Sequence, residues 1–216
     1  RVLAASCIRD VTDGMVVNTA TERAEKSRAL ITELLAADQP DVSHDKSSHL
    51  AEMMQLNNVE ESRFPSRQAD HVPLLDDSHV AMRVNLDACI HCNLCVRACR
   101  EVQVNDVIGM AGRGHDAKIV FDMDDPMGHS TCVACGECVQ ACPTGALMPA
   151  TVLDDDQAGD SQDYDREVQS VCPYCGVGCQ LSFKIKDDEV KYVEGVEGPA
   201  NQNRLCVKGR FGFDYI

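Results

Sequence analysis

The 216-residue sequence contains no tryptophan, and aromatic residues make up only 4% of it. A core built on large aromatic side chains is therefore not expected, and other interactions must help to hold the fold together. No apolar run reaches the roughly 18 residues of a membrane helix, which excludes a helical membrane span. Basic residues are also scarce, because 20 Lys and Arg stand against 35 Asp and Glu, a formal net charge of −15. This balance argues against a nucleic-acid binder, whose affinity depends on cations that neutralise phosphates.

Cysteine, in contrast, is abundant, with 13 residues. Small secreted domains use cysteines in disulfides, usually in even number and spread among loops. Here the number is odd, and 12 of the 13 cysteines fall into three groups with short internal spacings. Pairs separated by two residues are typical of metal sites. The sequence therefore predicts metal centres rather than disulfides.

Two of the groups share one pattern and form an internal repeat. Residues 89–99 read CIHCNLCVRAC, and residues 132–142 read CVACGECVQAC, followed by Pro143. Both have the spacing C-x2-C-x2-C-x3-C of bacterial two-cluster ferredoxins, in which the fourth Cys of each run binds the other cluster. Zinc also accepts four thiolates and is the alternative, although the doubled run with its terminal proline favours clusters. We assign one [4Fe–4S] cluster to Cys89, Cys92, Cys95 and Cys142, and a second to Cys132, Cys135, Cys138 and Cys99.

The third group has a different spacing, C-x2-C-x3-C-x26-C. Gly176 and Gly178 allow the backbone to fold tightly around a bulky inorganic core. Residues 180–186 and 189–194 alternate in polarity on either side of an acidic pair, which predicts a β-hairpin. A hairpin returns its end to its start, so it would bring the last cysteine back beside the other three. A third [4Fe–4S] cluster, with zinc again as the alternative, is predicted on Cys172, Cys175, Cys179 and Cys206.

The remaining sequence predicts short helices and strands. Thr19-x-x-Glu22 fits a capping box, and apolar residues then recur at helical spacing to about Ala37. A turn and a strand are expected over 11–19, and a second helix near 48–56. Between the two ferredoxin-like runs we expect a strand, a Gly-rich turn and another strand over 118–122.

The third group closes with Cys206-Val-Lys208-Gly209-Arg210 and resembles the N-terminal iron–sulfur segment of the molybdopterin oxidoreductases. Preceded by the doubled run and by a helix after the lone Cys7, the order resembles the catalytic α subunit of NAD-dependent formate dehydrogenases. The large iron–sulfur subunit of respiratory complex I and the iron-only hydrogenases share this front end. The resemblance covers essentially the whole chain and is most specific over 81–150 and 171–216.

The resemblance implies an α+β fold of small iron–sulfur domains in series, cut at both ends. Its parts are the C-terminal end of a plant-type [2Fe–2S] ferredoxin domain (1–37), a connecting region matching a His/Cys3 cluster domain (38–80), a two-cluster ferredoxin-like domain (81–150), an acidic linker (151–167) and the [4Fe–4S] segment of a molybdopterin oxidoreductase domain (168–216).

Two further residues take roles from the resemblance. Cys7 matches the last ligand of a [2Fe–2S] cluster whose other ligands would lie upstream. Lys208 matches the lysine between the [4Fe–4S] cluster and the pterin, which assists electron passage. The complete chain would also carry a molybdenum or tungsten bis-molybdopterin guanine dinucleotide, and no catalytic residue is expected before Ile216.

One departure from the family concerns the connecting region. Relatives carry a further cluster there with the spacing H-x3-C-x2-C-x5-C. His44 fits the histidine, but the cysteine positions hold Ser48, Ala51 and Asn57. We therefore predict no cluster in this region and expect His44 and His49 at the surface. His91, between two ligands, is expected to be exposed or to support the ligands.

The implied function is the electron-transfer portion of a cytoplasmic enzyme that oxidises formate. Its partners would be a flavin- and NAD-binding iron–sulfur subunit and a small [2Fe–2S] subunit. Three alternatives remain open: the complex I subunit, another molybdopterin oxidoreductase, and a stand-alone electron carrier. The doubled run argues against the complex I subunit, which usually keeps one cluster at this place.

The ligand assignment predicts a definite metal content. Anaerobically reconstituted protein should bind about 12 irons and as many sulfides per chain, because three cubes hold four of each. Iron and acid-labile sulfide analysis checks this number. Tightly bound zinc without visible absorption, or about 16 irons per chain, would show that the assignment is wrong.

Overall fold

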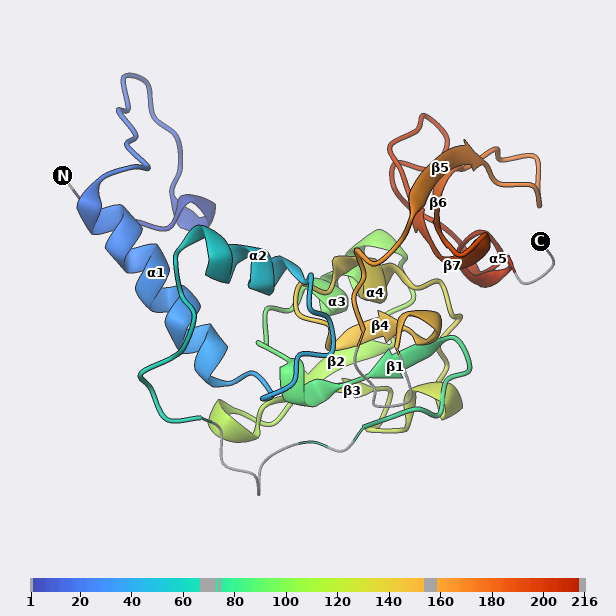
Figure 1. Cartoon of the computed structure of the whole chain (residues 1–216), viewed down its shortest axis with the longest axis horizontal. Helices are drawn as coiled ribbons and strands as arrows, with labels where there is room; N and C mark the ends of the chain where they lie inside the picture. Colours follow the sequence, from blue (N-terminus) through green and yellow to red (C-terminus); the bar gives the residue numbers. More distant parts are fainter. Residues whose placement is uncertain (1, 67–72, 74, 154–158, 214–216) are drawn as a thin grey trace.

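The computed structural model describes residues 2–66, 73, 75–153 and 159–213. Figure 1 shows a helical arm formed by the N-terminal part, a central body and a C-terminal module built on a small sheet. The arm and the C-terminal module lie on opposite sides of the central body in this view. Helices and strands are mixed in all but the arm, in agreement with the predicted α+β class.

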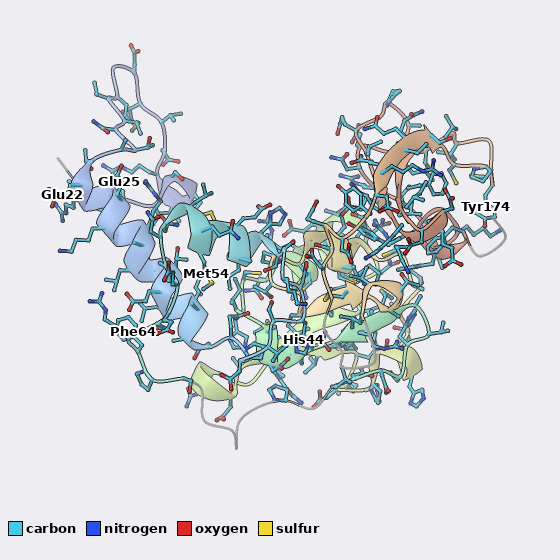
Figure 2. The ribbon with its side chains drawn as sticks, viewed as in Figure 1. Glu22, Glu25, His44, Met54, Phe64 and Tyr174 are labelled. Atoms are coloured by element: carbon cyan, nitrogen blue, oxygen red, sulfur yellow. The ribbon has the colours of Figure 1, made fainter. Side chains whose placement is uncertain are left out.

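The arm contains helices α1 (Glu22–Ala37) and α2 (His49–Leu56). Both predicted helices are confirmed, but the cap of α1 was placed wrongly. The cap is Thr21, whose Oγ1 accepts a hydrogen bond from the Ala24 amide at 3.3 Å, and not Thr19. Glu22 and Glu25 lie in the first turn (Figure 2), where a carboxylate interacts favourably with the positive end of the helix dipole.

The strand expected over 11–19 was predicted wrongly. This segment has no strand, and it follows a 3₁₀ turn at Ser6–Ile8. A strand needs a neighbour to take up its backbone hydrogen bonds. No strand in the part of the chain that the structure describes pairs with residues 11–19. Residues 11–19 are all exposed.

The central body holds two antiparallel strand pairs. Strand β1 (Met82–Val84) pairs with β4 (Leu147–Pro149), so the two ends of the body meet. Strand β2 (Ile108–Ala111) pairs with β3 (Lys118–Phe121), as predicted for the region between the cysteine runs. Each run leads into a short helical segment: α3 (Leu94–Arg97) continued by a π-helical turn at Ala98–Val102, and α4 (Glu137–Ala141).

The core of this body is small and includes cysteines. Met82, Val84 and Met127 are almost fully buried, and only one aromatic ring, Phe121, is among the buried residues of this cluster. Four of its buried members are cysteines from the two runs: Cys89, Cys95, Cys99 and Cys138. These four thiols therefore lie in the interior of the body, whereas Cys92 is exposed.

The C-terminal module is an antiparallel sheet of β5 (Arg166–Val171), β6 (Gln180–Lys186) and β7 (Glu189–Gly195), followed by α5 (Val207–Phe211). The predicted hairpin is β6–β7, and its turn residues Asp187 and Asp188 have positive φ values of 51° and 62°. Strand β5 begins at Arg166, two residues before the predicted start of the C-terminal [4Fe–4S] segment at 168. Residues 154–158 of the predicted linker lie outside the described residues.

None of the helices in the described part of the chain is both long and apolar enough to cross a membrane.

The cap of α1 gives a test of this part of the fold. Thr21→Ala should weaken the first turn of α1 by about 1 kcal/mol, because the Ala24 amide loses its acceptor. Hydrogen exchange of the amides at the start of α1 should accelerate accordingly. Thr19→Ala is the matched control and should leave these amides unchanged; equal acceleration in both variants would contradict the assignment of the cap.

Candidate metal centres

The two ferredoxin-like runs share the backbone conformation around their second cysteine. In the first run His91 and Asn93 have φ values of 55° and 62°, and in the second run Ala134 and Gly136 have 56° and 72°. These left-handed residues occupy equivalent places, immediately before and after the second cysteine of each run. The repeat seen in the sequence is thus also a repeat in local structure. Such turns direct successive amide groups inward, which suits an anionic sulfur site.

The first predicted ligand set comes together from both runs. Burial raises the pKa of the Cys95 thiol to about 12, and the nearby thiols of Cys142, Cys89 and Cys92 contribute to this rise. Burial likewise raises the pKa of Cys92, with a contribution from Cys142. Cys142 belongs to the second run, so the exchange of the fourth cysteine is present in the geometry.

The second predicted set shows the reciprocal exchange. Burial raises the pKa of Cys138 well above its ordinary value, and Cys135, Cys132, Cys95 and Cys99 add to the effect. Burial also raises the pKa of Cys132, and the thiol of Cys99 from the first run contributes. Because Cys138 is near Cys95 as well, the two sets are neighbours in the same core.

The third set lines a cavity of about 100 Å³ in the C-terminal module, together with Lys208 and Tyr174. Burial and the thiols of Cys172, Cys175 and Cys206 raise the pKa of Cys179. The β-hairpin therefore returns Cys206 to the other three cysteines, as predicted. Tyr174, labelled in Figure 2, donates its hydroxyl to the carbonyl of Gly212, which ties the cysteine loop to the end of α5.

Backbone amides donate to several of these sulfur atoms. The Val107 amide lies 3.3 Å from Cys99 Sγ, and the Ala134 amide lies 3.4 Å from Cys132 Sγ. Hydrogen bonds of this kind stabilise negative charge on sulfur and raise the potential of a cluster that the sulfur binds. These backbone N–H donors therefore favour thiolate ligands.

The donor sets fit [4Fe–4S] clusters. Each set holds four thiols, and burial raises the pKa of at least one thiol in each set, Cys95, Cys138 and Cys179 among them, so iron would have to displace the protons and supply the positive charge. Among the described residues, which include all 13 cysteines, no disulfide is formed. Within the same residues no three His, Cys, Asp or Glu side chains are arranged to hold one metal ion. The roles of the individual cysteines as ligands remain predictions.

Cys7 stands apart from these sets in its surroundings. It lies exposed on the 3₁₀ turn Ser6–Ile8. Its role as a [2Fe–2S] ligand remains a prediction from the resemblance.

The expectation that His44 is a surface residue was wrong. Only 16% of its side chain is exposed, and its Nε2 lies 2.9 Å from both carboxylate oxygens of Asp87 in the central body (Figure 2). The pair connects the arm to the segment that precedes Cys89. His49 is exposed, as expected, and His91 is partly buried.

The three positions at which the resemblance implies cysteine, Ser48, Ala51 and Asn57, lie on or at the ends of α2. The Ser48 hydroxyl caps α2 by accepting from the Ala51 amide at 3.2 Å. Asn57 ends α2, and its side-chain amide donates to Thr32 Oγ1 on α1 at 3.2 Å. The contact between Asn57 and Thr32 joins α2 to α1.

Sequence reasoning missed the side chains that join the central body to the C-terminal module. Arg210 lies four residues after the predicted ligand Cys206, and Glu137 lies between the predicted ligands Cys135 and Cys138. They form a buried ion pair. Charged residues next to ligand positions were the available signal, but nothing in the sequence indicated that these two would meet.

Two protein-family models match parts of the chain. Residues 88–146 match the 4Fe-4S dicluster domain, and residues 165–216 match the molybdopterin oxidoreductase Fe4S4 domain. The chain therefore contains small iron–sulfur domains of mixed helix and sheet content, of the kind found in molybdopterin oxidoreductases. The matches support [4Fe–4S] binding by both regions.

Curated relatives carry different names. An NADH-quinone oxidoreductase subunit of Rhizobium meliloti (strain 1021) is 33% identical over 223 residues, which cover 100% of this chain and 25% of the relative. The "Putative formate dehydrogenase SH0748" of Staphylococcus haemolyticus (strain JCSC1435) is 30% identical over 169 residues, 62% of this chain and 17% of the relative. The chain spans about a quarter or less of these relatives.

A solved structure shows a similar fold. A chain of the NAD⁺-reducing [NiFe]-hydrogenase in its H₂-reduced state superposes with a TM-score of 0.60 and 24% sequence identity, over 68% of this chain and 64% of that chain.

The argument from the doubled run against the complex I subunit gains no support from the comparisons, because the NADH-quinone oxidoreductase relative aligns along the whole chain.

The exchange of fourth ligands gives a sharp prediction. Cys99→Ser should remove about four irons per chain, and the lost cluster should be the one on Cys132, Cys135 and Cys138, because Cys99 lies with these thiols. Cys142→Ser is the matched variant and should affect the cluster on Cys89, Cys92 and Cys95. Iron analysis with Mössbauer or electron paramagnetic resonance spectra of both variants checks this. Loss of the cluster within the mutated run itself would contradict the exchange.

Proposed function

We propose that this chain is the electron-transfer portion of an NAD-dependent formate dehydrogenase α subunit, acting in the cytoplasm. Electrons from formate oxidation at a molybdenum or tungsten pterin centre would cross it toward a flavin- and NAD-binding partner, with a small [2Fe–2S] subunit as a further partner. The observation that carries the proposal is the arrangement of the thiols. Two interleaved sets lie in one core, and a third set shares its cavity with Lys208.

When bound, [4Fe–4S] clusters would supply one-electron transfer, with potentials set by charge, hydrogen bonds to sulfur and exposure. The residues of this chain would hold the thiolates in place and shield the buried ones, such as Cys95 and Cys138, from water. Backbone amides such as that of Val107 stabilise the negative charge on sulfur. Lys208 lines the cavity of the third set and is proposed to assist electron passage between this cluster and the pterin.

The contacts between the parts support one order of the sites. The amide of Leu205, next to the third-set cysteine Cys206, donates to Glu137 Oε1 of α4 at 3.1 Å. The Gln103 side-chain amide, just after the Cys99 turn, donates to the Leu205 carbonyl at 3.1 Å. The third set thus borders the second set.

The first set borders the arm. The Gln39 side-chain amide donates to the carbonyl of Ala88, and the Leu50 amide donates to the carbonyl of Pro143 at 3.0 Å. Ala88 precedes Cys89, and Pro143 follows Cys142. The proposed path therefore runs from the third set through the second to the first, and then toward the arm that carries Cys7.

The second candidate is the large iron–sulfur subunit of respiratory complex I. The NADH-quinone oxidoreductase relative, which aligns over the whole chain at 33% identity, favours it. The two functions share the electron-transfer role and differ in the source of electrons. Only a formate dehydrogenase would accept them from formate.

The electron donor separates the two candidates. In the intact protein with its partner subunits, formate should reduce the clusters under anaerobic conditions, seen as bleaching of their visible absorption. Reduction by NADH but not by formate would favour the complex I subunit instead. Reading the same gene beyond Ile216 is the first check, since a Cys or selenocysteine followed by His in a pterin-binding domain is expected.

The role of Lys208 is tested in the same assay. Lys208→Ala should slow reduction of the clusters by formate about tenfold or more, because the path from the pterin loses its bridging side chain, with iron content unchanged. Lys46→Ala, which changes an exposed lysine of the arm, is the control. Equal rates in the wild type and Lys208→Ala would rule out the proposed role.

A further inference from the structure

The side chain of Arg210 crosses from the C-terminal module into the central body and is almost completely buried. Only 3% of its side chain is exposed, and its ion-pair partner Glu137 is 9% exposed. Arg210 lies on α5 in the segment that follows Cys206. Glu137 is the first residue of α4 and stands between Cys135 and Cys138. The pair therefore joins the segments that carry the second and third cysteine sets.

The guanidinium uses each of its three nitrogens. Its Nε donates to the carbonyl of Cys135 at 2.8 Å, Nη1 donates to Gln140 Oε1 at 2.7 Å, and Nη2 donates to Glu137 Oε1 at 2.6 Å. Gln140 Oε1 also accepts from the Gly195 amide at the end of β7 at 3.2 Å. A planar guanidinium is suited to such a fixed fork, and a lysine ammonium would satisfy only part of it.

The backbone of the second run leaves room for this side chain. A Cβ at Gly136 would lie 2.1 Å from Arg210 Cδ and 2.9 Å from the ring of Phe211. Gly136 also has a φ of 72°, a conformation that favours glycine. The Gly136 position of the second run is thus shaped for contact with α5. In the first run Asn93 stands at the equivalent place.

The buried cation lies beside a sulfur site. Arg210 Nε donates to the carbonyl of Cys135, and Glu137 stands two residues further along the same loop, so a positive and a negative charge both lie next to this predicted ligand. Charges that are screened little by water act strongly on a neighbouring centre. Arg210 and Glu137 would therefore have opposite effects on any charge that the second set holds.

We propose that Arg210 is a positioning residue that fixes the Cys206 segment against the Cys135 loop and raises the reduction potential of the cluster on Cys132, Cys135, Cys138 and Cys99. The proposal rests on the proposed electron-transfer function and deepens it. A fixed cation lowers the cost of the added electron, and Glu137 opposes this effect while holding the guanidinium in place. The pair sets both the spacing and the relative potential of two adjacent centres.

The test uses redox titrations of the intact protein, followed by electron paramagnetic resonance of each cluster. Arg210→Met should lower the potential of the second-set cluster and weaken its magnetic interaction with the third-set cluster. Glu137→Gln should raise the same potential. We expect each single change to alter the ratio of reduced to oxidised cluster at a fixed ambient potential by about tenfold, about 59 mV for a one-electron couple.

Two further variants separate charge from packing. Arg210→Lys keeps the charge but not the fork, so the potential should stay near that of the wild type while the magnetic interaction changes. Arg166→Met removes the same charge from an exposed ion pair with Asp188, and should change neither property. Opposite shifts from Arg210→Met and Glu137→Gln are the signature that a purely structural role would not produce.

The outcomes distinguish the two levels of the argument. If the wild type contains no [4Fe–4S] clusters, the proposed function fails and this inference fails with it. If the wild type holds the clusters but the two single variants shift the potential in the same direction, or not at all, only the role of Arg210 is overturned. Should Arg210→Met lose iron, Glu137→Gln decides alone, because its potential must rise.

Discussion

Gathering several thiolates at one place in a protein interior is the constraint on which this structure depends. Burial opposes ionisation of the Cys95 thiol, and the neighbouring thiols add to the penalty, so that its pKa rises to about 12. Such a group of thiols becomes favourable only when cations compensate the charge. The surrounding chain lowers the remaining cost with backbone amides that donate to sulfur, such as those of Val107 and Ala134. A fold with few aromatic residues can accept this constraint because the same cysteines also serve as its core.

The exchange of the fourth cysteine explains why the central body behaves as one unit. Cys142 lies with the first set and Cys99 with the second, so neither set can form before the two runs have met. Pairing of β1 with β4 brings the ends of the body together and supports this meeting. Cluster binding and folding of the body are therefore expected to be coupled, as in other proteins whose ligands come from distant parts of the chain.

Patterns of residues close together in the sequence predicted the features that depend on local geometry. The spacing of the cysteines, the β6–β7 hairpin and the return of Cys206 follow from residues close in sequence, and the structure contains all three. The cap at Thr21 was missed because Thr19 has Glu22 at the third following position, as a capping box requires, whereas Thr21 has Ala24 there. The contacts of His44 with Asp87 and of Arg210 with Glu137 join residues 43 and 73 positions apart, and no periodicity or spacing encodes such meetings.

These distant contacts share one property: each ends beside a cysteine set. His44 reaches Asp87 just before Cys89, Gln39 reaches Ala88, and Arg210 reaches the carbonyl of Cys135. The arm is thus fastened to the body by polar side chains at the edge of the first set. The C-terminal module is fastened in the same manner at the edge of the second. Because electron transfer depends steeply on the separation of its centres, contacts at the ligand loops fix the quantity that matters most, whereas contacts elsewhere would leave it free to vary.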